Sequence, residues 1–209
     1  MPLVIELDFK FKTRVILWKI EETEDELLKF ITLSLTEKEK FKKRKSPKHR
    51  LEFLGSRAAM ISLGIDLDKV LFNDNGAPYL TDHRYCSISH TDGYGAVVVS
   101  DNKIGVDVEI YKDKITRIAS KFVHPAEGFV NKSENSLKML TRLWTVKESV
   151  YKAFGVPGIH FSKAIQVDPF QLQDQQGTAR LVHLKTEYFF TLYFRTITNG
   201  ELCIAIQTI

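Results

Sequence analysis

Ile104-Gly105-Val106-Asp107-Val108-Glu109-Ile110 alternates apolar residues with other residues at a period of two. This period is typical of a β-strand whose apolar side chains face a core. Asp107 and Glu109 then share the opposite face, roughly 7 Å apart. Two aligned carboxylates repel each other, and in a cleft they favour a hard cation such as Mg2+. On this strand alone, two solvated acids on a half-exposed face are the favoured interpretation.

The composition is that of an ordinary soluble globular protein. The 209 residues, 44% hydrophobic and 27% charged, can form one large domain or two small ones. Apolar runs such as Ala96-Val97-Val98-Val99 are too short to span a bilayer, and the charged first twenty residues exclude an ordinary signal peptide or membrane anchor. The two cysteines, Cys86 and Cys203, lack metal-ligand spacing and are predicted to be buried thiols in a reducing cytoplasm.

A long helix is predicted from Ser136 to Phe154, ended by Gly155. One arc of about 140° on this helix carries mixed aromatic and charged residues: Trp144, Lys147, Glu148, Tyr151 and Lys152. A mixed arc is neither a clean core face nor a clean solvent face, which favours the wall of a cleft. The structural alternative is an ordinary Glu148–Lys152 salt bridge within the helix, worth a few tenths of a kcal/mol.

The remaining elements come in blocks. The first half is predicted to begin with a hairpin of residues 3–9 and 13–20. Helices follow at 24–33, from a capping box at Thr36 and Glu39, and from Pro47 to Gly64, and then strands at 85–90 and 94–100. The second half is predicted to have helices at 114–122 and from Pro125, and strands at 164–167, 179–184, 188–196 and 201–208 with turns at 186–187 and 198–200. Blocks of helices and strands indicate an α+β protein. We expect two halves, 1–102 and 103–209.

The segment from Lys38 to Arg50 is strongly basic, with eight cations offset only by Glu39. A solvated face explains it structurally, whereas a site for a phosphorylated ligand or a docking patch for an acidic partner explains it functionally. Nucleic acid ranks lower because only Phe41 is interleaved among the charges. Arg50 and Arg57 fall on nearly the same side of their helix, where both could face one phosphate.

Two motifs together resemble a known enzyme family. The first is Ile104–Glu109, and the second is Trp144-Thr145-Val146-Lys147-Glu148-Ser149-Val150-Tyr151-Lys152. Their joint occurrence resembles the signature of the 4'-phosphopantetheinyl transferases. The length and the extra N-terminal half are similar to the larger, surfactin-synthetase-activating (Sfp-like) type. That resemblance implies a monomer of two similar α+β halves related by pseudo-twofold symmetry, with the active site at their interface.

Other segments resemble further motifs of this family. Ser87-Ile88-Ser89-His90-Thr91 looks like the Ser-His motif, which implies that His90 and Ser89 hold coenzyme A phosphates. Glu52–Arg57 resembles the segment whose arginine binds the 3'-phosphate, so Arg57 is our first choice and Arg50 our second. Phe122–Glu127 resembles the segment with an additional active-site glutamate.

The resemblance implies transfer of the 4'-phosphopantetheine arm of coenzyme A to a serine of an apo acyl or peptidyl carrier protein, releasing adenosine 3',5'-bisphosphate. Asp107, Glu109 and Glu148 would bind Mg2+, and Lys152 and Lys147 would contact phosphate oxygens. Glu127 would take the serine proton, directly or through water. The basic segment 38–48 would steer acidic carrier proteins, with no nucleic acid or membrane as partner.

Two other functions stay open, and one of them rests on a departure from the family. The Gly-Lys-Pro motif is replaced by Gly76-Ala77-Pro78, which removes a lysine contact to the nucleotide. A non-catalytic module that binds carrier domains or another phosphorylated ligand is therefore one alternative. A generic Mg2+-dependent phosphohydrolase is the other.

Overall fold

The computed structural model describes residues 3–6, 12–132 and 134–208. The chain divides into two compact units, Met1–Asp101 and Asn102–Ile209. Each unit combines one antiparallel sheet with helices, so the predicted α+β class in two halves is confirmed. The pseudo-twofold relation between the halves, an active site at their interface and the roles assigned to each half stay predictions.

The N-terminal unit contains a six-stranded antiparallel sheet. Its strand order is β1-β2-β6-β5-β4-β3, and the strands are β1 Leu3–Glu6, β2 Arg14–Lys19, β3 Val70–Phe72, β4 Pro78–Leu80, β5 Tyr85–Thr91 and β6 Tyr94–Ser100. The predicted hairpins β1–β2 and β5–β6 are confirmed, although residues 7–9 of the expected first strand lie outside the described residues. The short strands β3 and β4, which flank the turn at residues 73–77, were not expected.

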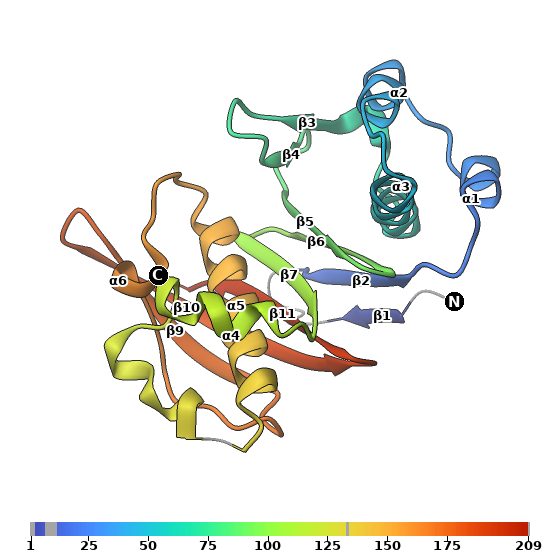
Figure 1. Ribbon diagram of the computed structural model, residues 1–209. Coiled ribbons are helices and arrows are strands. Elements are labelled where there is room, and N and C mark those ends of the chain that lie inside the picture. Colours follow the sequence, from blue (N-terminus) through green and yellow to red (C-terminus); the bar gives the residue numbers. More distant parts are fainter. Residues whose placement is uncertain (1–2, 7–11, 133, 209) are drawn as a thin grey trace. The chain divides into compact units, whose positions relative to one another are not determined.

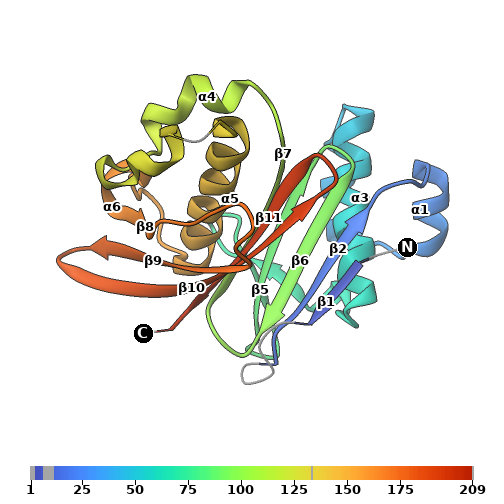
Figure 2. The ribbon, with the colours of Figure 1, turned by 90° about the horizontal axis from the view of Figure 1, so that it is seen from below.

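Among the described residues of this unit, the helices are α1 Glu24–Phe30, α2 Leu35–Lys42, α3 Pro47–Ser62 and the short 3-10 helix η2 Leu67–Lys69. As predicted, α3 begins with Pro47 at its first position. It lies along β2, β5 and β6 (Figure 2). Phe53, Leu54 and Ala58 on this helix are fully buried in the core of the unit.

The capping box predicted at Thr36 and Glu39 is wrong. The N-cap of helix α2 lies two residues earlier, at Ser34, whose side chain accepts a hydrogen bond from the Glu37 backbone N–H. Burial of Leu33 in the core fixes the chain just before this point, so Ser34 is the residue in place to cap the helix. A full capping box is found instead at Thr23 and Glu26 of α1.

The C-terminal unit contains a five-stranded antiparallel sheet of order β7-β11-β10-β9-β8. Its elements are β7 Ile104–Ile110, α4 Lys114–Ile118, η3 Ala119–Lys121, η4 Pro125–Lys132, α5 Ser136–Phe154, α6 Phe161–Ala164, β8 Ile165–Val167, β9 Gln176–His183, β10 Thr186–Ile197 and β11 Gly200–Gln207. The turn predicted at 186–187 is wrong, because the chain turns at Leu184 and Lys185, both with positive φ. No helix within the described ranges is long and apolar enough to cross a membrane.

Helix α5 packs on β7 and β11 and has the predicted bounds, Ser136–Phe154. The contact with β7 is very close at Gly105. A Cβ atom there would lie 2.0 Å from the Ser149 carbonyl oxygen and 2.7 Å from the Ala153 backbone nitrogen. Only glycine fits at position 105. Helix α5 therefore covers the face of β7 that carries the odd-numbered residues. Asp107 lies on this same face.

The end of α5 provides a stability prediction. Gly155 follows the helix with φ 74°, in the left-handed region, and no atom lies within 4 Å of where its Cβ would be. Gly155→Ala is expected to lower the free energy of unfolding by about 1 kcal/mol, because a side chain disfavours this backbone conformation. Thermal unfolding measures it. Gly128→Ala, with equal free space but no positive φ, is the matched control, and an equal loss in both variants would contradict the argument.

Candidate active site

Asp107 and Lys152 form an ion pair between β7 and α5. The Lys152 Nζ donates to Asp107 Oδ1 at 2.7 Å and to the Val106 carbonyl at 3.0 Å. The Asp107 residue is only 4% exposed, whereas the Lys152 side chain is 26% exposed. The expected alternative of a solvated Asp107 is therefore wrong. The partner of Lys152 is this strand residue instead of Glu148 within the helix.

Glu148 and Glu109 complete an acidic cluster around this pair; both are half-buried. The pKa of Glu148 is raised to about 7, mainly by burial and next by the neighbouring Asp107 carboxylate; Glu109 also raises it, while Lys152 acts in the opposite direction. Three carboxylates and one ammonium thus interact electrostatically, with an excess of negative charge. The structure brings together four of the residues predicted from the two motifs.

The donor chemistry of this cluster fits Mg2+, which prefers carboxylate oxygens. The excess negative charge would also be relieved by a divalent cation. Within the parts of the chain that the structure describes, however, no three His, Cys, Asp or Glu side chains are gathered closely enough to hold a metal ion. Binding one ion by Asp107, Glu109 and Glu148 therefore requires side-chain rearrangement.

Glu127 and Lys147 form a second ion pair, and it is fully buried. The Lys147 Nζ lies 2.7 Å from Glu127 Oε2, and neither side chain has any exposed surface. Lys147 also donates to the Ile165 and Phe161 carbonyls. Glu127 accepts from the backbone N–H groups of Val167 and His124 at 2.8 Å and 2.6 Å. The pair therefore ties η4 and α5 to β8.

This burial bears on two predicted roles, which stay predictions. In this arrangement both side chains are enclosed and hydrogen-bonded, so contact of Lys147 with a phosphate, or of Glu127 with a serine hydroxyl, would require the buried pair to open. Burial also lowers the pKa of Lys147, although Glu127 opposes this. Lys147 and Lys152 stand at opposite ends of the 140° arc. One end of the arc faces the interior and the other faces the acidic cluster.

The aromatic residues of the arc have a packing role. Trp144 contacts the rings of Phe122 and Phe161 at centroid distances of 5.1 Å and 5.7 Å. Tyr151 contacts Phe161 at 5.5 Å. The arc is therefore divided between ring packing by Trp144 and Tyr151 and the acidic cluster, to which Glu148 and Lys152 belong.

A cavity of about 190 Å³ adjoins Glu109. Its lining is half apolar and half polar, and consists of Glu109, Ile110, Lys112, Lys114, Ile115, Ile118, Thr141 and Trp144. It was not predicted from the sequence, since its residues come from β7, the loop after it, α4 and α5 and share no local pattern. It places a cavity of mixed polarity beside a member of the acidic cluster.

The predicted nucleotide-binding residues lie in the N-terminal unit. His90 on β5 is half exposed, with its Nδ1 3.3 Å from Glu52 Oε2 of α3, while Ser89 is buried. Arg57 is buried over the Phe53 ring and pairs with Glu37 of α2. These three residues therefore come from neighbouring elements of one unit.

Arg50 and Arg57 pair with carboxylates on different helices. Arg50 pairs with Glu24 of α1 and lies 4.2 Å from the Phe41 ring centroid, whereas Arg57 pairs with Glu37 of α2. Their binding of one phosphate stays a prediction. Arg57 is the one connected to a large pocket.

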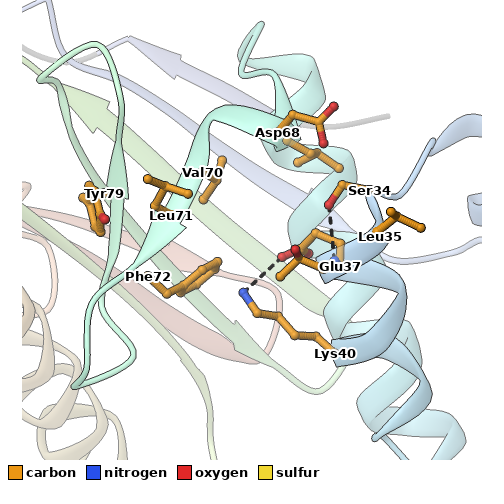
Figure 3. Close-up of a pocket in the computed structure, with 11 residues that line it drawn as sticks. Ser34, Leu35, Glu37, Lys40, Asp68, Val70, Leu71, Phe72 and Tyr79 are labelled. Atoms are coloured by element: carbon orange, nitrogen blue, oxygen red, sulfur yellow. Dashed lines mark hydrogen bonds and ion pairs between the residues drawn. The ribbon is translucent and has the colours of Figure 1, made fainter.

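This pocket lies between the start of α2 and the β3–β4 hairpin and has a volume of about 680 Å³ (Figure 3). Lys40 lies 3.3 Å from Glu37 and 3.3 Å from the centroid of the Phe72 ring, and burial lowers its pKa. Glu37 links Lys40 to Arg57. Tyr79 on β4 adds an aromatic wall (Figure 3). The pocket thus combines the Lys40 ammonium group and two carboxylates, Glu37 and Asp68, with aromatic surface, and Arg57 pairs with Glu37 from outside the lining.

Comparisons with known proteins agree with the motifs. Residues 103–207 match the family model of the 4'-phosphopantetheinyl transferase superfamily. The chain is 27% identical over 146 residues to 4'-phosphopantetheinyl transferase gsp of Aneurinibacillus migulanus, covering 68% of this chain and 60% of that protein. It is 30% identical over 126 residues to "Putative 4'-phosphopantetheinyl transferase slr0495" of Synechocystis sp., covering 52% of this chain and 51% of that protein. The matches thus span between half and two thirds of these relatives, and the family match covers half of this chain. The chain belongs to the 4'-phosphopantetheinyl transferase superfamily.

Proposed function

We propose that this protein transfers the 4'-phosphopantetheine arm of coenzyme A to a serine hydroxyl of an apo acyl or peptidyl carrier protein, releasing adenosine 3',5'-bisphosphate. The clustering of Asp107, Glu109 and Glu148 around Lys152, within the segment that matches the family, is the observation that carries the proposal. The names of both relatives support it. The two buried free thiols agree with a cytoplasmic protein, and we take it to act as a monomer.

The acidic cluster is the proposed Mg2+ site. When bound by Asp107, Glu109 and Glu148, Mg2+ would stabilise the charge that develops on the leaving nucleotide during attack at phosphorus. Lys152 would contact the same phosphate oxygens through its partly exposed ammonium group. Since Glu127 is enclosed, the serine proton would go to one of the half-buried carboxylates, Glu109 or Glu148.

The pocket beside α2 is the proposed site for the nucleotide end of coenzyme A. Its volume of about 680 Å³ lies within the usual range for cofactor sites. The aromatic rings of Phe72 and Tyr79 would contact the base, and Arg57 with Lys40 would bind a phosphate in competition with Glu37. His90 and Ser89 would hold the remaining phosphates.

The cavity beside Glu109 is the proposed entrance for the arm or for the carrier serine, because it joins apolar surface to the acidic cluster. The basic segment 38–48 would raise the association rate of an acidic carrier protein by electrostatic steering. Reversing several of these lysines to Glu should then lower kcat/KM for the carrier and flatten its dependence on salt. An unchanged salt dependence would remove this role.

Intact-mass measurement of an apo carrier protein tests the function. Incubation with this protein, coenzyme A and Mg2+ should add the mass of one phosphopantetheine arm, and EDTA should abolish the gain. Recovery of a hydrolysed coenzyme A product without carrier modification would favour a phosphohydrolase. No gain with fatty-acid, polyketide and peptide carriers, despite a folded protein, would favour the non-catalytic binding module.

Ala77 offers a gain-of-function prediction. It lies in the turn between β3 and β4, where only its backbone is hydrogen-bonded, to Asn73. Ala77→Lys is expected to lower the KM for coenzyme A about 3- to 10-fold by adding a cation next to the proposed nucleotide pocket. Asn75→Lys adds the same charge to the same turn and is the control. Equal effects from both variants would indicate general electrostatics instead of a specific contact.

A further inference from the structure

Glu52 of α3 is a buried carboxylate that lies beside a half-exposed histidine. Its side chain is 8% exposed, and its Oε2 atom lies 3.3 Å from Nδ1 of His90 on β5, whose side chain is 49% exposed. A buried carboxylate needs a partner, because removing an unpaired charge from water is costly. His90 supplies a partner here, and the two side chains therefore have to be considered together.

The contact results from a close approach of α3 to the sheet. His90 stands opposite Gly95 of β6 in the strand register. A Cβ atom at Gly95 would lie 2.7 Å from the Ser56 backbone nitrogen, so only glycine lets α3 come this near. Glu52 is one helical turn before Ser56, on the same side of α3. The close approach therefore also brings Glu52 to the end of the strand that carries His90.

The other charges around His90 are engaged with each other. Lys48, one turn before Glu52 on α3, pairs with Asp92 in the β5–β6 turn at 2.7 Å. Strand β6 carries no charged residue, and its Tyr94 is on the opposite face from His90, because side chains alternate along a strand. Glu52 is thus the carboxylate in contact with the imidazole, and Lys48 with Asp92 forms a separate, exposed pair.

This pairing decides which protons the imidazole of His90 carries. A ring nitrogen that faces a carboxylate bears a proton, so His90 donates from Nδ1 to Glu52. In a neutral ring Nε2 would then be an acceptor and would repel a phosphate oxygen, whereas in the imidazolium both nitrogens donate. The Glu52 carboxylate favours the imidazolium, because opposite charges at this distance stabilise each other.

We propose that Glu52 is a positioning residue that holds His90 as an imidazolium, with Nε2 as the donor to a phosphate of coenzyme A. The identity of the ligand rests on the proposed function, whereas the pairing with His90 requires no ligand. Glu52 contacts the imidazole and acts on the substrate only through it. Its charge should therefore affect the affinity for coenzyme A and leave the chemical step unchanged.

A nuclear magnetic resonance titration of the imidazole protons tests the pairing without any activity. The chain has six histidines, and His90→Gln identifies the His90 signal by its absence. In the wild type the midpoint of this signal should lie above the ordinary histidine value of about 6.5. Glu52→Gln, which keeps the shape, should move the midpoint down by about one pH unit. A wild-type midpoint below the ordinary value, or the same midpoint in both proteins, would overturn the proposal.

Asp92→Asn is the matched control for this titration. It removes one carboxylate two residues from His90, but that carboxylate pairs with Lys48. The His90 midpoint should move less than about a third as far as in Glu52→Gln, because exposed charges are screened by water and salt. An equal movement would show a general effect of nearby acids and overturn the specific role of Glu52.

Binding of adenosine 3',5'-bisphosphate to the full chain, measured by calorimetry, tests the ligand. Its Kd should be about 5-fold higher in Glu52→Gln than in the wild type at about pH 8, and equal at about pH 5.5, where both proteins carry the imidazolium. The KM for coenzyme A should follow the same pattern, with kcat within about 2-fold. Equal affinity of the two proteins at both pH values would overturn the phosphate contact. Passing both tests without any transfer to a carrier protein would contradict the proposed function and support the role of Glu52.

Discussion

Asp107→Ala is expected to lower kcat/KM for phosphopantetheinyl transfer by at least about 10³-fold while leaving the fold intact. Asp107 is the buried member of the acidic cluster and the ion-pair partner of Lys152. Its loss would remove a Mg2+ ligand and also free the ammonium group that it holds in place. Lys152 keeps its hydrogen bond to the Val106 carbonyl and stays partly exposed to solvent, so its ammonium group is not left buried without a partner.

Transfer rates by intact mass and thermal unfolding, measured on the same preparation, check this result. Asp107→Asn, which keeps the shape, should raise the Mg2+ concentration needed for half-maximal rate. Glu187→Ala is the control, because this carboxylate is exposed and pairs with Arg180 on the β9–β10 hairpin. Turnover of Asp107→Ala at the wild-type rate would remove Asp107 from the metal site.

The strand and helix that carry the acidic cluster could be predicted from local pattern. Strand β7 has a strict period of two, and α5 has five helical turns of apolar spacing with a glycine at its end. In a long periodic segment, a single residue that departs from the pattern does not hide the period. The three-residue strands β3 and β4 contain too few residues for any period, so they were missed.

The contacts that individual side chains make could be predicted only in part. Asp107 and Lys152 are 45 residues apart and meet because Gly105 lets α5 approach β7 closely. Lys147 and Lys152 belong to one motif and one arc, yet only the packing of β8 and η4 decides that Lys147 turns inward. The turn at Leu184 and Lys185 likewise lacks Gly or Asn and adopts positive φ under the constraint of the hairpin register.

Lys147→Met is expected to lower the free energy of unfolding by about 3–5 kcal/mol, because it leaves the Glu127 carboxylate buried without its cation. For a chain of this size the apparent Tm should fall by roughly 6 to 20 °C. Lys138→Met is the matched control: it makes the same substitution on α5 at an exposed lysine and should leave Tm nearly unchanged.

A double variant separates a structural pair from a catalytic one. Adding Glu127→Gln to Lys147→Met removes the second buried charge and should restore at least half of the lost Tm. If Glu127 serves only to position η4 and α5 against β8, the folded double variant should keep kcat within about 10-fold of the wild type. A general base would instead cost about 10²- to 10⁴-fold in kcat at restored stability. That outcome would return Glu127 to the chemistry and require the buried pair to open during turnover.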